Sequence, residues 1–330
     1  MTKPQVAISG CLLGERVRYD GNHKRSDFVA DVLKPHIEPL SICPETGMGM
    51  KVPRPPIELI TSRTGIELRM VDEPHTEYTH KMQSYVNKLA GAHSQLSGII
   101  SKSASPSCGV HDTPIRNDRT GTIDYGAGYY IRLMQESYPH IPIIDQKDIE
   151  MDDYRHRYLV HVFTLHRFYQ RLRQHGLEGL RSFHFEHRTL LLSLDIEATK
   201  QLQLALEQVI NKKATQFDYL KLLSRILQRP FSANRALKML EHIAANQNDI
   251  HRSALRLLSK SMKATQQDQW ISALFFENLN NLITQFNLGE VINKPFFTPY
   301  PVELMVTTEK KNKQKFARKA SELKLVEKED

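Results

Sequence analysis

The chain has 330 residues, with 45 lysines and arginines against 37 aspartates and glutamates and a formal net charge of +8. This length exceeds the usual size of one hydrophobic core, so two domains are expected. The sequence has no run of 18 apolar residues, which excludes an ordinary transmembrane helix. An odd count of three cysteines and no recognisable secretory leader argue against a disulfide framework, so we expect a reducing, cytoplasmic location.

Residues 1–150 alternate short apolar runs with glycine and proline turns, which predicts an α/β domain. The runs QVAISG (5–10) and HIPIID (140–145) are typical of strands, and EYTHKMQSYVNKLAGA (77–92) has helical spacing. Loops that follow parallel strands lie at the carboxyl edge of the sheet, where open α/β folds place ligands. We therefore expect an α/β fold with its cysteine-bearing loops at that sheet edge.

Residues 151–308 have few turn residues and long stretches of helical periodicity, which predicts an all-α domain packed as a bundle. The expected helices cover residues 154–174, 188–210, 217–228, 234–247 and 268–286. The chain then returns through KPFFTPYPVEL (294–304), an extended proline-bearing segment. Residues 309–330 are dense in charge, which predicts a disordered tail.

Each of the three cysteines lies in a short polar segment marked by glycine or proline: SGCLLG at Cys11, ICPETG at Cys43 and SPSCG at Cys108. Their wide spacing does not fit a local zinc knuckle, so three separate loops would supply the ligands. Zinc would need a fourth ligand, from His23, His111 or Asp20. An iron–sulfur cluster would leave one iron open. Three unrelated buried thiols or a lone nucleophile are the remaining alternatives.

Longer stretches around the cysteines carry a family resemblance. They read CLLGERVRYDGNHK, CPETGMGMKVPRPPIEL and KSASPSCG, followed by DYGAG. These motifs, in this order, resemble the thiouracil desulfidase (TudS-like) domain over roughly residues 3–145. The resemblance implies that Cys11, Cys43 and Cys108 ligate a [4Fe-4S] cluster with one iron not bound by protein. It also places Glu45 and Ser105 close to the substrate.

The chemistry that the resemblance implies is redox-neutral hydrolysis of a C=S bond in a thiolated uracil, giving uracil and sulfide. Glu45 is expected to act as general base for water or as a proton shuttle to the ring nitrogen. Ser105 is expected to orient Glu45 or bind the ring. From the residues alone, Glu45 is more typical of a solvated turn or helix-start glutamate, and Ser105 fits turn or capping chemistry. Arg54 and Glu58 are expected to form a structural ion pair or to position substrate.

Charge is unevenly distributed: residues 1–150 hold 17 basic and 18 acidic residues, and the remainder holds 28 and 19. A basic helical region is typical of a polyanion surface, although most charge runs are solvated helix faces. The stretches FHFEHRTLLL and ITQFNLGEVINKPFFTPYPVEL are similar to a helical domain often fused behind the TudS-like domain. Such fused proteins are associated with 4-thiouridine in tRNA, which makes tRNA an expected partner through the basic half.

The leading hypothesis is therefore a [4Fe-4S] desulfidase acting on 4-thiouridine in tRNA, with no membrane association. A desulfidase for free thiouracil bases or nucleosides is the closest alternative. A non-catalytic iron–sulfur module that binds RNA or senses iron is an alternative of another class, and a zinc hydrolase is a third. The sequence does not fix the oligomeric state.

Overall fold

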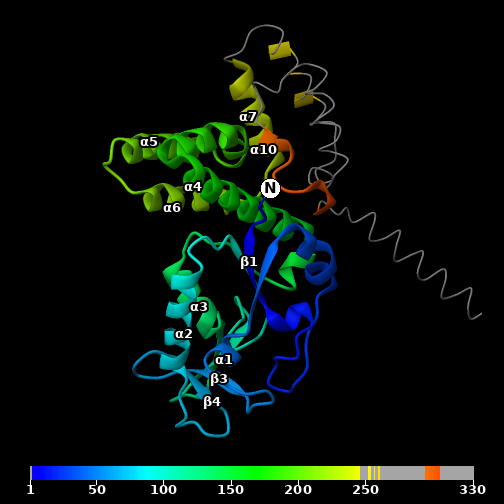
Figure 1. The fold of residues 1–330 in the computed structure, drawn as a ribbon, viewed down its shortest axis with the longest axis vertical. Helices are drawn as coiled ribbons and strands as arrows, with labels where there is room; N and C mark the ends of the chain where they lie inside the picture. Colours follow the sequence, from blue (N-terminus) through cyan, green and yellow to red (C-terminus); the bar gives the residue numbers. More distant parts are fainter. Residues whose placement is uncertain (1, 246–251, 254–255, 257–258, 261–293, 305–330) are drawn as a thin grey trace, which may run out of the picture.

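The computed structural model describes residues 2–245, 252–253, 256, 259–260 and 294–304. An α/β region comes first in the chain, and a helical region follows it; the long helix α4 lies where the two meet (Figure 1). This arrangement confirms the predicted fold class. None of the described helices is both long enough and apolar enough to cross a membrane. The helix expected over 268–286 and the tail at 309–330 lie outside the described residues.

The first sheet consists of four parallel strands in the order β2-β1-β5-β8. The strands are β1 (Gln5–Ser9), β2 (Glu38–Ile42), β5 (Gly98–Ser101) and β8 (Ile143–Asp145). Val6, Ile8 and Ile100 point into one hydrophobic cluster, whereas Ala7 and Ile99 point into another. The sheet is thus buried on both faces, which is the usual environment of a parallel sheet.

Short helices and loops connect these strands. They are the 3₁₀-helix η1 (Gly10–Leu13), the π-helical turn η2 (Phe28–Leu33), the 3₁₀-helices η3 (Lys34–His36) and η4 (Asp148–Glu150), and the helices α1 (Pro44–Gly47), α2 (Thr79–Ala92) and α3 (Tyr129–Ser137). Helix α2 lies within the predicted range 77–92. Met82 of α2 and Met134 of α3 pack with Ala7 and Ile99, so these two helices cover one face of the sheet.

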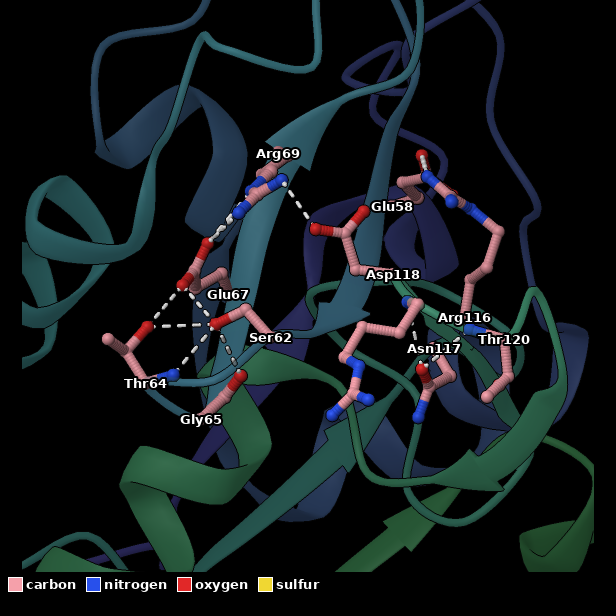
Figure 2. Close-up of polar contacts among 11 residues, drawn as sticks. Glu58, Ser62, Thr64, Gly65, Glu67, Arg69, Arg116, Asn117, Asp118 and Thr120 are labelled. Carbon is pink, nitrogen blue, oxygen red and sulfur yellow. Dashed lines mark hydrogen bonds and ion pairs between the residues drawn. The ribbon is translucent and has the colours of Figure 1, made fainter.

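A second, mixed sheet was not predicted from the sequence. Its order is β4-β3-β6-β7, formed by β3 (Ile57–Thr61), β4 (Ile66–Met70), β6 (Thr113–Asn117) and β7 (Ile123–Gly126). Figure 2 shows the polar contacts along it, including Glu67 between Ser62, Thr64 and Arg69. Hydrogen bonds from Ser62 and Thr64 lower the pKa of Glu67 to about 2.

Helix α4 (Asp152–Leu194) is a helical hairpin rather than one straight rod. Gly176 interrupts it with φ +55°, a left-handed conformation that glycine adopts without strain. The two halves fold back on each other, since Arg167 contacts His187 and Arg171 contacts Glu186. A Cβ atom at Gly179 would lie 2.0 Å from the carbonyl oxygen of Arg171, so the halves approach closely there.

The remaining helices pack around this hairpin. They are α5 (Ile196–Ile210), α6 (Gln216–Leu227), α7 (Ala233–Ala245), α10 (Lys294–Phe297) and the 3₁₀-helix η7 (Val302–Leu304). The helix expected over 188–210 is broken at Asp195, whose extended backbone ends α4 and whose carboxylate caps α5 by accepting a hydrogen bond from Ala198. The expected extended segment 294–304 instead contains two short helices.

The helical region shares a core with the parallel sheet. Leu159 and Val162, in the first half of α4, belong to the same hydrophobic cluster as Val6 and Ile8. A Cβ atom at Gly98 of β5 would lie 2.7 Å from side-chain atoms of both Tyr158 and Val162, so the helix lies directly against the strand. The predicted boundary at residue 150 thus marks a change in sequence pattern. The first half of α4, which follows this boundary, nevertheless packs against the parallel sheet of the preceding region.

Candidate functional site

The three cysteines surround one cavity at the carboxyl edge of the parallel sheet. The cavity encloses about 380 Å³, and Cys11, Cys43 and Cys108 are all among its lining residues. Cys11 lies in η1 after β1, Cys43 directly follows β2, and Cys108 lies in the loop after β5. Because β2, β1 and β5 are neighbours in the sheet, residues far apart in the sequence meet at this edge.

The loop that carries Cys108 is shaped by its own polar groups. The Ser105 hydroxyl accepts hydrogen bonds from the backbone N–H groups of Ser107 (3.3 Å) and Cys108 (3.0 Å). Gly109 N–H donates to the Ser105 carbonyl, and Gly128 N–H donates to the Gly109 carbonyl, each at 2.8 Å. A Cβ atom at Gly128 would lie 2.5 Å from the Ser107 carbonyl oxygen. This glycine therefore lets the segment before α3 press directly on the cysteine loop.

The protein environment disfavours free thiolates at two of the cysteines. Burial and the neighbouring Cys43 raise the pKa of Cys11 to about 11, although Lys102 and Arg18 act in the opposite direction. Burial raises the pKa of Cys108 as well, against a hydrogen bond with Ser9. Such thiols lose their protons when a metal ion binds to the sulfur atom in place of the proton.

The donor set at this cavity fits a soft, thiolate-bound centre. Three sulfur atoms from three loops are the ligands typical of iron–sulfur clusters and of zinc. The fourth ligands considered for zinc, His23, His111 and Asp20, are not among the lining residues. Arg18, Lys24 and Lys102 do line the cavity, and their positive charge would balance several thiolates around one centre.

Glu45 lines the same cavity, in the first turn of α1. Its Oε2 accepts hydrogen bonds from Arg54, 2.7 Å from Nε and 2.6 Å from Nη2, and its Oε1 accepts one from the Ser107 hydroxyl at 3.0 Å. The side chains of Arg54 and Glu45 are 4% and 12% exposed, so this is a largely buried ion pair. Arg54 also donates to the Val17 carbonyl, 2.9 Å away, which fixes the guanidinium from a second side.

The pairing of Arg54 with Glu58 expected from the sequence is wrong. Glu58 instead pairs with Arg116 of the neighbouring strand β6, at 2.8 Å. Within β3 the side chain of Glu58 projects toward β6, whereas Arg54 precedes the strand and turns toward α1. The closeness of Ser107 to Glu45 was also missed, although Ser107 belongs to the SPSCG motif. Ser105, the serine expected near substrate, lines the cavity and also makes the turn contacts described above.

In the helical region, the histidines of FHFEHRTLLL are core residues. His184 and His187 are 4% and 0% exposed. His184 bonds to the Tyr219 hydroxyl, and His187 lies between Arg167 and the Phe183 carbonyl. Burial lowers the pKa of both, so both stay neutral at physiological pH.

On the exposed side of the same helix, a groove of about 580 Å³ is lined by Arg181, Phe185 and Arg188 together with residues of α5. The Phe185 side chain is 65% exposed. Among the basic residues of the helical region, Arg155 and Arg167 make internal contacts. The exposed ones include Arg173, Arg181, Arg188, Lys212, Lys213, Arg225 and Arg229.

Comparison with known proteins identifies the first part of the chain. The family model described as 2-thiouracil desulfurase matches residues 6–146. A solved structure of a [4Fe-4S]-dependent thiouracil desulfidase, TudS, is 27% identical and aligns over 45% of this chain and 94% of its own, with a TM-score of 0.37. No curated protein matches. Residues 6–146, which bring the three cysteines to one cavity, are thus the part of the chain that matches the 2-thiouracil desulfurase family model.

Proposed function

We propose that the protein is an iron–sulfur desulfidase that converts thiolated uracil to uracil and sulfide, with 4-thiouridine in tRNA as its substrate. The observation that carries this proposal is the convergence of Cys11, Cys43 and Cys108 with Glu45 on one cavity of about 380 Å³. The family of residues 6–146 supports the thiouracil chemistry. The net reaction consumes one water and releases hydrogen sulfide, so it needs no electron donor.

The three cysteines would hold a [4Fe-4S] cluster through three of its irons. When bound, such a cluster would offer an iron without a protein ligand as a soft Lewis acid for the thiocarbonyl sulfur. Arg18 and Lys102 would compensate the negative charge that three thiolates bring to the cavity.

Glu45 is the proposed general base. Its carboxylate would take a proton from the water that attacks the C=S carbon and return it to the ring nitrogen or the leaving sulfur. Arg54 donates twice to Oε2 and Ser107 donates once to Oε1, which fixes the carboxylate plane and leaves a lone pair of Oε1 for water. Arg54 is thus a positioning residue. Ser105 is proposed to contact the ring from the cavity wall.

The proposal that the substrate is a tRNA rests on the exposed face of α4. Arg181, Phe185 and Arg188 are spaced at helical intervals along one groove. Arginines that contact phosphates beside an exposed aromatic ring that stacks on a base are a common combination in single-stranded RNA binding. The exposed Lys212 and Lys213 between α5 and α6 and Arg225 of α6 would extend the positive surface.

A comparison of kcat/KM for two substrates tests this proposal. We expect Arg181→Glu/Arg188→Glu to lower kcat/KM for 4-thiouridine-containing tRNA at least about tenfold, with little change for free 4-thiouridine. The matched control is Arg63→Glu/Arg119→Glu, in the α/β region. An equal loss of kcat/KM for tRNA in both double variants would indicate that the effect comes from net charge rather than from a specific surface. Unchanged kcat/KM for tRNA in the α4 variant would overturn the proposed RNA surface.

The cavity also favours a second candidate, desulfidation of a free thiouracil base. Its volume of about 380 Å³ is sufficient for a single base or nucleoside. A wild-type protein whose kcat/KM for free 2-thiouracil or 4-thiouracil exceeds that for thiolated tRNA would favour this candidate. A non-catalytic iron–sulfur module predicts no turnover of either substrate.

A further inference from the structure

We propose that His111, Asp145 and Asp148 bind one divalent first-row transition-metal ion beside the cysteine cavity. Asp145 is the last residue of β8, Asp148 begins η4, and His111 lies three residues after Cys108. One imidazole nitrogen and one oxygen from each carboxylate all lie within 4.8 Å of one another. Among the described residues, this is the cluster of histidine, cysteine and acidic side chains that meets that spacing.

The buried carboxylate of Asp145 is the observation that points to a ligand. Asp145 is 0% exposed. Its Oδ1 accepts hydrogen bonds from the backbone N–H groups of Lys147 (2.7 Å) and Asp148 (2.9 Å). Its Oδ2 is buried and has no hydrogen-bond partner within the described part of the chain. A buried charged oxygen without a partner is strongly unfavourable, and a cation would remove that penalty.

The other two side chains lie where such a cation would need them. His111 Nδ1 is 3.9 Å from Asp145 Oδ2, too far for a direct hydrogen bond but suitable for a bridging ion. His111 is 60% exposed, so an ion can enter from solvent. The ammonium group of Lys147, two residues after Asp145, is bonded to Asp112 at 2.9 Å.

The mixed ligand set selects the class of metal. Carboxylates suit hard cations such as Mg²⁺, Ca²⁺ and Mn²⁺, whereas imidazole suits Zn²⁺ and the later first-row ions. Mn²⁺ and Zn²⁺ accept both donors, so we assign the site to ions of this kind. Metal–ligand distances of about 2.1 Å are reached by small side-chain rotations, because His111 belongs to a loop, Asp145 ends its strand and Asp148 begins a short helix.

The position of the site gives the ion a structural consequence. His111 and Cys108 belong to one loop, while Asp145 ends β8, the strand next to β5, and Asp148 follows it. The same two segments are already joined where Ser103 N–H donates to the Gln146 side chain at 2.7 Å and where Lys147 pairs with Asp112 at 2.9 Å. A bound ion would add a further tie and hold the Cys108 loop against the edge of the sheet.

The test uses the full chain with its three cysteines occupied by their cluster, so that thiolates do not compete for the added metal. Mn²⁺ is the probe, and loss of the free-ion signal in electron paramagnetic resonance measures binding. We expect one Mn²⁺ per chain and a thermal transition that rises with Mn²⁺. His111→Ala and Asp148→Asn should each weaken binding about tenfold or more and remove the Mn²⁺-dependent shift.

The matched controls are His75→Ala and Asp124→Asn, which change exposed residues outside the cluster. Both should bind Mn²⁺ as the wild type does. The proposal is overturned if the wild type binds no Mn²⁺ at millimolar concentration. It is also overturned if His111→Ala and Asp148→Asn keep the wild-type affinity, because the ion would then lie elsewhere. A folded His111→Ala protein is expected, since this side chain is mostly exposed.

Discussion

At the scale of single residues, the proposed catalytic role depends on the ion pair between Glu45 and Arg54. Three cysteines alone could hold a metal centre in an enzyme or in a structural metal protein. A carboxylate at the same cavity, fixed by two donors from Arg54 and one from Ser107, is an arrangement suited to moving protons. Its role can be tested without disturbing the cysteines.

Glu45→Gln should lower kcat at least about 100-fold while iron and sulfide content stay at the wild-type level, since general acid–base groups contribute about 10²–10⁴-fold to rate. Glutamine keeps the shape of the side chain but cannot take a proton at neutral pH. Single-turnover assays on 4-thiouridine measure the effect. Wild-type turnover in this variant would remove Glu45 from the mechanism.

Arg54→Met should destabilise the protein by about 3 kcal/mol, because it leaves the Glu45 carboxylate without its buried partner. The same substitution in the Glu45→Gln protein should have a much smaller effect, because no charge remains to be compensated. Urea unfolding of the four proteins measures the coupling. Equal losses in both backgrounds would show that Arg54 acts through its contact with the Val17 carbonyl instead.

At the scale of elements, the parallel order β2-β1-β5 explains why three distant cysteines meet. Each follows a strand end, and the loop after β5 is pressed into place by the segment before α3. A glycine at position 128 is required for this contact, because a Cβ atom would lie 2.5 Å from backbone of the cysteine loop.

Gly128→Ala should therefore displace the Cys108 loop and lower the iron content of purified protein to less than about half. A backbone atom cannot move aside as a flexible side chain can. Gly91→Ala is the matched control, since a Cβ atom there meets nothing within 4 Å and alanine favours the helix. Full iron content in Gly128→Ala would contradict this account of the loop.

The sequence allowed the prediction of β1 and β8 and of cysteine-bearing loops at the sheet edge, because apolar runs and turn residues are local signals. It did not predict the pairing of Arg54 with Glu45, since that contact depends on how the chain turns between α1 and β3. The outer strand β7 of the second sheet was missed because it is largely exposed and lacks a strong apolar run; its Ile123 and Tyr125 are 56% and 70% exposed. The reversal at Gly176 was hidden within continuous helical periodicity.

At the scale of the whole molecule, the α/β and helical regions form a continuous core through the first half of α4. A fragment ending at residue 150 would lose Leu159 and Val162 from the face of the sheet that carries Val6 and Ile8. We expect this fragment to show no cooperative thermal transition in circular dichroism, whereas the full chain does. A stable fragment that still binds iron would show that the α/β region folds alone.

Stability should fall as the pH decreases below about 6.5, because several histidines are buried in the neutral form. Burial lowers the pKa of His156 to about 4 and that of His161 to about 3. Between these values and 6.5, the unfolded chain binds protons that the folded chain does not, so each drop in pH favours unfolding. Urea midpoints measured from pH 7.5 to 4.5 check this, and a flat profile would contradict it.

The most direct test of the central claim is anaerobic purification followed by iron and sulfide analysis and an assay on 4-thiouridine-containing tRNA. The account predicts a brown protein with about four irons per chain that removes the thiouridine absorbance and releases sulfide. Cys11→Ser, Cys43→Ser and Cys108→Ser should each lose both the iron and the activity. A colourless protein that still turns over the substrate, or an iron-containing protein with no activity on any thiolated uracil, would contradict it.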